Sequence, residues 1–238
     1  MSIGSFTGIS EGAEELNIEL PPGTEAAFEA YYDFLENHGR QVNLTAISGS
    51  EEVVSLHFLD SLALLNILNF KNKKVIDIGS GAGFPGVPLK LAEPSIDLTL
   101  LDSAGKRISF LSELSKLLDI EATCVYERAE EAAHKQHLRE HFNIVVSRAV
   151  ARLNMLCELC LPYVAIGGYF IAMKTTDSED ETAEAENAVS TLGCELTQNF
   201  DYKIPGKDII RRAVVIKKIT GTPEKYPRRF AKIQKSPL

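Results

Sequence analysis

The chain has 238 residues, of which 45% are hydrophobic, and it carries a net charge of −8. This length fits one domain of ordinary size with an added lobe, and the hydrophobic fraction allows a sizeable core. No window holds the roughly 18 uncharged apolar residues of a membrane span, and the first residues lack the basic and apolar blocks of a secretory signal. We therefore expect a cytoplasmic protein that makes no membrane contact.

A small helical lobe is predicted ahead of the main domain. The first two dozen residues read as a flexible tail. Apolar side chains then recur at helical intervals over residues 24–38, between a Thr24 cap and Gly39, and a second helical region starts at Ser50. The predicted parts are a flexible tail, a helical lobe, a main domain and a basic C-terminal tail, at residues 1–23, 24–71, 72–219 and 220–238.

The main domain alternates short apolar runs with helical stretches. This alternation predicts a mostly parallel sheet with helices on both faces, which is an α/β, Rossmann-like fold. The last two runs come without a helix between them and predict a C-terminal antiparallel hairpin. The predicted strands are residues 74–78, 96–102, 121–127, 142–148, 167–174, 195–203 and 211–219.

The first predicted strand passes into a glycine-rich loop in the sequence VIDIGSGAGFPG, residues 75–86. In open α/β sheets, ligands bind beyond the carboxyl ends of the strands, and glycines let the backbone approach them closely. Residues 81–86 match the G-x-G-x-x-G fingerprint of dinucleotide binding, with Asp102 as the distant acid. This short match leaves two other readings open: S-adenosylmethionine, or a tight turn that binds no ligand.

Asp77 favours S-adenosylmethionine. A carboxylate just ahead of the loop would oppose a pyrophosphate by about 4 kcal/mol at ~4 Å and an effective dielectric constant of ~20. It suits the ammonium group of the methionine end, directly or through water. The order acid-x-G-x-G-x-G is that of class I methyltransferases, in which the acid after the second strand accepts the ribose hydroxyls. The predicted cofactor residues here are Asp77, Gly79, Ser80, Gly81, Gly83 and Asp102.

Six segments along the chain carry a more specific resemblance. They are QVNLTAI, HFLDSL, VIDIGSGAGFPGVPLKL, RAEE, VVSRAVARL and YPRR, in that order. Together they resemble the RsmG, or GidB, family of methyltransferases, which act on guanine N7 of 16S ribosomal RNA. The resemblance runs from about residue 25 to the C-terminus. It implies a class I S-adenosylmethionine-dependent fold and cofactor contacts by Gly79, Phe84, Ala129 with Glu130, and Arg148.

These residues also have physical readings of their own. Arg148 ends the fourth predicted strand, where it would position the cofactor, an RNA phosphate or the purine ring, or form a structural ion pair. Phe84 offers an apolar wall beside the loop or packs helix against sheet. Ala129 and Glu130 would read the adenine edge, although an acid such as Glu130 is also favoured at a helix N-terminus.

Substrate contacts are expected from the lobe, the sheet edge and the C-terminus. His57 and Asp60 lie three apart on one helical face, where they orient the lobe over the site or have a structural role. Residues 203–238 hold eleven Lys or Arg and two acids, which indicates a face for an anionic polymer or a solvated basic tail. After YPRR the chain departs from the family pattern. The expected RNA contacts are His57, Lys174, Arg228 and Arg229.

The chemistry implied by the resemblance needs little from the protein besides alignment. Guanine N7 has a free lone pair, so no general base is required, and the enzyme must align N7, methyl carbon and sulfur. The motifs of amino methylation and of C5-cytosine methylation are missing. Cys157 and Cys160 have C-x-x-C spacing, but no second ligand pair follows, so no metal is expected.

The preferred reading is therefore an enzyme that methylates a guanine in the decoding-region loop of 16S rRNA, free or in a small-subunit assembly particle. We also expect a monomer. The alternatives are a methyltransferase for another RNA or a small molecule, a dinucleotide-dependent oxidoreductase, and a nonenzymatic RNA-binding module.

Overall fold

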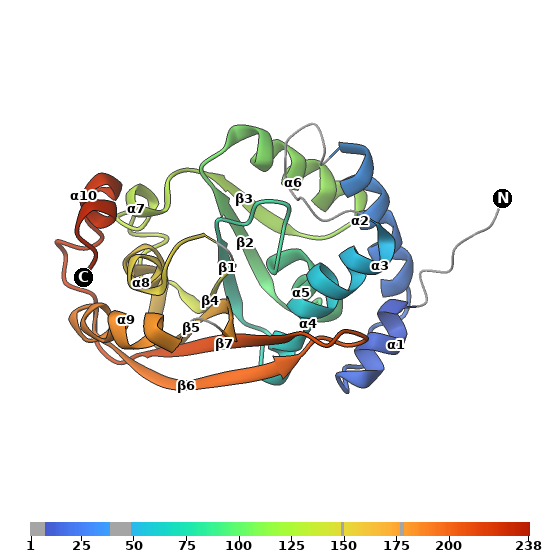
Figure 1. Cartoon of the computed structure of the whole chain (residues 1–238). Coiled ribbons are helices and arrows are strands. Elements are labelled where there is room, and N and C mark those ends of the chain that lie inside the picture. The colour runs from blue at the N-terminus through green and yellow to red at the C-terminus, as the bar shows by residue number, and fades with distance from the viewer. Residues whose placement is uncertain (1–7, 39–48, 149, 177–178) are drawn as a thin grey trace.

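The computed structural model describes residues 8–38, 49–148, 150–176 and 179–238, apart from the side chains of residues 179 and 180. Its centre is a seven-stranded sheet with the order β3-β2-β1-β4-β5-β7-β6 (Figure 1). Strands β1 to β5 are parallel, and β7 pairs antiparallel with both β5 and β6, as predicted. The strands are β1 (Lys74–Ile78), β2 (Asp97–Asp102), β3 (Ala122–Tyr126), β4 (Phe142–Arg148), β5 (Val164–Thr175), β6 (Cys194–Lys203) and β7 (Ile210–Lys218).

Helices cover both faces of the sheet, because successive side chains of a strand point to opposite sides. In β5, Ile171 and Met173 belong to one buried cluster, whereas Phe170 and Ala172 belong to the other. The lobe, α5 and α6 pack on the first face, and α7, α8 and α9 on the second. These helices are α5 (Gly86–Ala92), α6 (Gly105–Leu117), α7 (Ala129–Ala132), α8 (Leu153–Cys160) with its 3₁₀ extension η4 (Leu161–Tyr163), and α9 (Glu179–Thr191).

The lobe consists of α2 and a second helical stretch of changing geometry. Helix α2 (Thr24–His38) has the predicted bounds and buries Phe28, Tyr31 and Leu35. The second stretch contains a π-helical turn, a geometry that often occurs at functional sites. Residues 39–48, which include the expected Gly39 cap and the whole QVNLTAI segment, lie outside the described residues. The stretch comprises α3 (Ser50–Val53), the π-helical η2 (Val54–Leu59), α4 (Asp60–Leu62) and the 3₁₀-helical η3 (Ala63–Asn66).

Residues 8–15 differ from the flexible tail that was expected over residues 1–23. They form helix α1 (Gly8–Glu15), in which Ile9 and Ala13 are buried. A Cβ added to Gly12 would lie 2.2 Å from Cδ1 of Leu59, so α1 packs closely on η2. A helix this short is not stable alone, so its stability comes from packing on the lobe. The local sequence gives no sign of this packing. Residues 1–7 lie outside the described residues.

The C-terminal residues, predicted as a basic tail over 220–238, pack on the domain and are not a solvated tail. They run along the second face of the domain and end in helix α10 (Phe230–Lys235), beside α7 and α8 (Figure 1). Tyr226 and Ile233 are buried in the second cluster. Apolar side chains interspersed among the cations therefore hold this segment on the domain.

Candidate functional site

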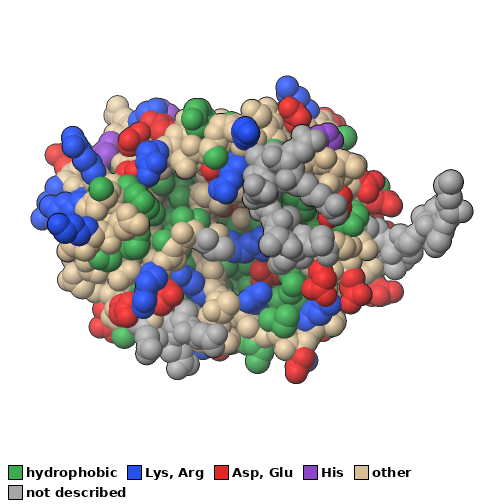
Figure 2. All heavy atoms as spheres, turned by 45° about the horizontal axis from the view of Figure 1, so that its top comes forward, with side chains coloured by type: hydrophobic (Ala, Val, Ile, Leu, Met, Phe, Trp, Pro, Cys, Tyr) green, Lys and Arg blue, Asp and Glu red, His purple; other side chains and the backbone are tan. Residues whose placement is uncertain are grey.

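A cavity of about 640 Å³ opens at the carboxyl ends of the central strands. Sheet order reverses between β1 and β4, so the cavity lies at the switch point where such folds bind ligands. Its volume suits a small molecule or a nucleotide-sized group. Figure 2 shows a hollow on this side of the molecule with Lys and Arg side chains around it. Lining residues come from the lobe, the glycine loop and the strand ends, and include Leu56, His57, Asp60, Gly79, Phe84, Arg148, Lys174 and Arg211.

The glycine loop after β1 forms one wall of the cavity. Gly79 and Gly81 have φ angles of 74° and 57°, which glycine adopts without steric cost. The amides of Gly79 and Ser80 donate to the carbonyl of Leu101 at 2.8 and 3.1 Å, which fastens the loop to β2. Among the predicted loop residues, the structure places Gly79, Ser80, Gly81 and Phe84 in the cavity lining.

Gly83 lies on the other side of the loop. A Cβ at this position would lie 2.7 Å from the hydroxyl of Tyr31, which donates to the carbonyl of Ala82 at 2.6 Å. Gly83 therefore permits the lobe to approach the loop, and it is not among the lining residues. Tyr31 was missed by the sequence reasoning because on α2 it reads only as part of a buried helical face.

Asp77 lies beneath the loop and not in the cavity lining. Its Oδ2 accepts the Gly86 amide at 2.8 Å, and Oδ1 has no hydrogen-bond partner among the described residues. Burial raises the pKa of Asp77 to about 7, while the Gly86 hydrogen bond acts to lower it. The carboxylate therefore lies behind the loop that it supports, and its predicted contact with a ligand ammonium, directly or through water, stays a prediction.

Asp102 holds the loop from the end of β2. Its Oδ2 accepts the Gly81 amide at 3.0 Å, and its Oδ1 accepts the Ala104 amide at 2.9 Å. Arg107, which lines the cavity, places Nη1 at 3.3 Å from the same Oδ2. These bonds fix the buried carboxylate beside the loop and outside the cavity lining, and its predicted contact with ribose hydroxyls stays a prediction.

Arg148 connects the end of β4 to the lobe. Its Nη1 donates to the carbonyl of Leu56 at 3.1 Å and lies 3.3 Å from Oδ2 of Asp60. Its Nη2 donates to Nδ1 of His57 at 2.9 Å. The guanidinium lies 4.9 Å from the centroid of the Phe84 ring, on which His57 also stacks at 4.5 Å. The structure thus brings together three residues that the sequence could only propose separately: His57, Phe84 and Arg148.

The electrostatics of this group favour positioning over proton transfer. Burial and the nearby Arg148 charge lower the pKa of His57 to about 3. The imidazole is therefore neutral near pH 7 and accepts from Arg148. Burial raises the pKa of Asp60, while Arg148 acts to lower it. Asp60 also accepts the hydroxyl of Tyr202 at 2.8 Å, so both groups are engaged in holding neighbours in place.

Tyr202 and Arg211 are cavity residues that the sequence reasoning missed. They come from the end of β6 and the start of β7, where the two strands pair. Because β7 is antiparallel to β5, its first residues lie at the edge where β5 ends, with Arg211 opposite Thr175. The predicted C-terminal hairpin contained this signal, since an antiparallel strand must start where its parallel neighbours end.

Lys174 lines the cavity but is already engaged. Its Nζ donates to the carbonyl of Ala151 and to Oε2 of Glu181, both at 2.7 Å. The Lys174 side chain is 13% exposed, so it is less available to an RNA phosphate than its position at the strand end suggests.

The other predicted residues lie outside the lining. Ala129 and Glu130 begin α7 after β3, and Glu130 accepts Nε of Arg128 at 2.7 Å. Arg228 is bound to the buried Glu158 and does not reach the cavity, whereas Arg229 is exposed on the C-terminal segment. The predicted adenine and RNA contacts of these residues stay predictions.

Neither a metal site nor a membrane-spanning helix is found in the part of the chain that the structure describes. No group of three or more His, Cys, Asp or Glu side chains there could hold a metal ion. Cys157 and Cys160 are buried free thiols whose pKa burial raises. In the same residues, no helix is long and apolar enough to cross a membrane.

Comparison with known proteins assigns the family. The model of the family "rRNA small subunit methyltransferase G", GidB, matches residues 24–209. The chain belongs to this family. It is 45% identical over 234 residues to the ribosomal RNA small subunit methyltransferase G of Alkaliphilus oremlandii, covering 97% of each chain. It is 41% identical over 240 residues to the ribosomal RNA small subunit methyltransferase G of Bacillus subtilis, covering 100% of this chain and 99% of the relative.

The fold of the chain is also found in solved structures of other proteins. A solved structure of M. jannaschii TYW2 in complex with AdoMet matches with a TM-score of 0.52 at 14% identity, over 67% of this chain and 75% of the other. At that identity the likeness concerns the fold alone. It agrees with the predicted Rossmann-like architecture.

Proposed function

We propose that this member of the small-subunit rRNA methyltransferase G family transfers a methyl group from S-adenosylmethionine to N7 of a guanine in 16S rRNA. The observation that carries the proposal is the switch-point cavity, whose polar groups are arranged to position a ligand. His57, with its lowered pKa, and Asp60 are both engaged with Arg148. A nucleophile with its own lone pair, such as guanine N7, needs no base from this group.

The residues present fit S-adenosylmethionine. Asp102 offers carboxylate oxygens for ribose hydroxyls, and the backbone of Gly79 and Gly81 permits close approach of a ligand. The unpartnered Oδ1 of Asp77 beneath the loop supplies negative potential that favours a cationic methionine end. When bound, the cofactor supplies the electrophilic methyl group on its sulfonium. Ala129 and Glu130 at the start of α7 would hold the adenine.

The chain's own contribution is to orient and enclose. Arg148 binds Leu56 of the lobe and lies over Phe84, and so fixes these two parts of the cavity lining relative to each other. Arg211 adds a further guanidinium to the cavity lining, together with Arg107 and Arg148, where it would bind the purine or a phosphate. Exclusion of water by the lobe and alignment of the reacting atoms account for the rate enhancement. The reaction takes place in the cytoplasm, with a monomer as the catalytic unit.

Mapping of N7-methylguanosine in 16S rRNA from cells with and without the protein tests the proposal. One methylated guanine should disappear when the protein is absent and return when it is supplied again. Calorimetry with S-adenosylmethionine and NAD tests the cofactor independently. Binding of NAD without binding of S-adenosylmethionine, or an unchanged methylation map, would contradict the proposal.

A further inference from the structure

Residues 219–238, called here the C-terminal arm, contain five Lys or Arg and one acid, Glu224. Four of the cations are exposed and form no ion pair with any residue that the structure describes. Some exposed cations elsewhere are paired, as Arg152 is with Glu184 and Lys135 with Glu127, whereas the four cations of the arm form no such pair with a described residue and lie close together in the sequence. The charge of the arm is therefore available to a partner. The four cations are Lys225, Arg229, Lys232 and Lys235.

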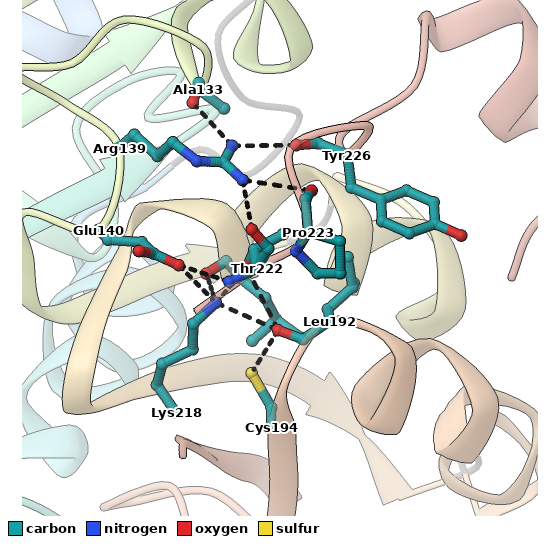
Figure 3. A network of polar contacts seen from close by, with 10 residues as sticks. Ala133, Arg139, Glu140, Leu192, Cys194, Lys218, Thr222, Pro223 and Tyr226 are labelled. Carbon is teal, nitrogen blue, oxygen red and sulfur yellow. Dashed lines mark hydrogen bonds and ion pairs between the residues drawn. The ribbon is translucent and has the colours of Figure 1, made fainter. Parts of the chain in front are cut away.

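A polar network at the start of the arm fixes it to the domain (Figure 3). Lys218 is fully buried, and its Nζ donates to the carbonyls of Leu161 and Leu192 at 3.2 and 3.1 Å and to the hydroxyl of Thr222. Glu140 places Oε1 at 3.4 Å from Nζ of Lys218 and accepts the Thr222 amide with the same oxygen. A buried ammonium held in this way leaves the following residues little freedom.

Arg139 adds a second attachment in the same network. Its Nη1 donates to the carbonyl of Tyr226 at 2.9 Å, and its Nη2 donates to that of Thr222 at 2.8 Å (Figure 3). Nε2 of His134 lies 3.0 Å from the carbonyl of Pro227. Side chains of the segment that follows α7 thus contact four backbone carbonyls of the arm, since Nη2 of Arg139 also donates to that of Pro223 at 3.4 Å.

The distal part of the arm is held by Glu158 of α8. This carboxylate is fully buried and accepts the Arg228 amide and Nε at 2.8 Å, and Nη2 at 2.6 Å. The guanidinium of Arg128 lies 5.2 Å from the ring centroid of Phe230 in α10. Arg128 follows the carboxyl end of β3, so α10 is held near the sheet edge that carries the cavity.

We propose that the C-terminal arm is a fixed phosphate-binding surface for the RNA substrate. Its four exposed cations contact the RNA backbone together with Arg128, which lies over Phe230, and Arg228 holds the arm in place. This inference rests on the proposed function and adds the location of the RNA surface. Figure 2 shows Lys and Arg side chains gathered at the left end of the molecule, where Figure 1 places α10. Phosphate contacts orient a nucleic acid without reading its sequence. Cations held in place lose less conformational entropy on binding than those of a mobile tail.

Neutralising the exposed cations tests the surface. In R229Q/K232Q/K235Q, affinity for a 16S rRNA transcript in filter binding should fall about tenfold or more. The slope of log affinity against log salt should decrease by about 2. S-adenosylmethionine binding by calorimetry should remain within about twofold of the parent. The matched control, K71Q/K73Q/K116Q, removes three positive charges near the amino ends of the strands and should leave RNA affinity nearly unchanged. Equal losses in both triple variants would overturn the assignment.

A second variant separates a fixed arm from a mobile basic tail. E158Q removes a negative charge and weakens the attachment of Arg228. A mobile tail would therefore bind RNA equally well or more tightly, whereas a fixed arm should bind about threefold or more weakly. E140Q provides the same comparison at the other end of the arm if E158Q does not fold. Unchanged or tighter RNA binding by a folded variant would overturn the proposal, whereas failure of the parent to methylate 16S rRNA would overturn the proposed function itself.

Discussion

Replacement of the buried Asp77 by Asn should stabilise the fold at high pH and weaken ligand binding. With a pKa of about 7 in the folded chain, it keeps its proton over a pH range where the unfolded carboxyl has lost it. Folding stability from this group is thus present below about pH 4 and is lost as pH rises to 7. Asp77→Asn should therefore unfold less readily than the parent at pH 8, and this advantage should shrink by up to about 4 kcal/mol towards pH 4.

The same variant should bind S-adenosylmethionine more weakly, because it lacks the negative charge beneath the loop. Denaturant titrations of the ligand-free protein at pH 4, 6 and 8 measure the first effect, and calorimetry at pH 8 the second. An advantage that does not depend on pH would mean that the parent carboxyl is charged throughout. Undiminished affinity would remove Asp77 from the ligand site.

Arg148 should not tolerate replacement by the other long cation. Lysine keeps the charge but lacks the planar fork that reaches Leu56, His57 and Asp60 together. For Arg148→Lys we expect the rate of methyl transfer to fall about hundredfold, since a small displacement of the lobe residues that Arg148 holds would disturb the alignment of the reacting atoms. Steady-state kinetics on 16S rRNA, with circular dichroism as the check on folding, measures this. Parental turnover in a folded Arg148→Lys protein would show that Arg148 has no positioning role.

The sequence located Asp77 from a local pattern and Arg148 from the family resemblance, but it did not give the contacts that either residue makes. The acid ahead of a glycine loop is a local signal. Which carbonyls, rings and carboxylates surround Arg148 depends on the packing of η2 against β4, from residues about 90 positions apart. The depth at which Asp77 is buried also depends on helix α5, whose Gly86 amide binds it. Neither relation leaves a periodic trace in the sequence.

Substitutions in helix α1 test whether this helix packs on η2, a contact that its sequence does not predict. In an exposed helix, Gly→Ala stabilises by about 1 kcal/mol. At Gly12 the new methyl group would meet the side chain of the buried Leu59, so Gly12→Ala should instead destabilise by about 1–3 kcal/mol. Gly8→Ala is the matched control, because its Cβ would lie 3.8 Å from Val54. Thermal unfolding of both variants gives the comparison, and stabilisation by Gly12→Ala would mean that α1 is not docked.

The elements that sequence reasoning found are those whose pattern is local. Strand β4 occupies the predicted residues 142–148, and α2 the predicted residues 24–38, because burial imposes a period on each. The elements it missed, α1 and α10, are short helices that are held by tertiary contacts. A buried Ile9 or Ile233 among polar neighbours looks like an isolated apolar residue until the surface that it contacts is known.

At the scale of the whole molecule, the C-terminal arm combines buried ion pairs that attach it with exposed cations on its outer side. The sequence separates an acidic body from a basic end, which suggested either a face for an anionic polymer or a solvated tail. The structure instead uses two acids of the body, Glu158 and Glu140, to bind cations in and next to the arm. The same electrostatic asymmetry thereby both attaches the arm and leaves its outer cations available. No count of charges could distinguish the two arrangements.

Substitutions of Arg228 and Glu158 test whether the attachment of the arm to α8 stabilises the fold. Arg228→Met leaves a fully buried carboxylate without its cation, which should cost about 3–5 kcal/mol. For a chain of this size, each kcal/mol lowers the melting temperature by about 2–4 °C. The double variant E158M/R228M removes both charges and should recover most of the loss, because an apolar pair needs no compensation in the interior. Calorimetric melting of the two single variants and the double variant completes the cycle. Additive losses would show that the two side chains do not interact, and the arm would then be free of α8.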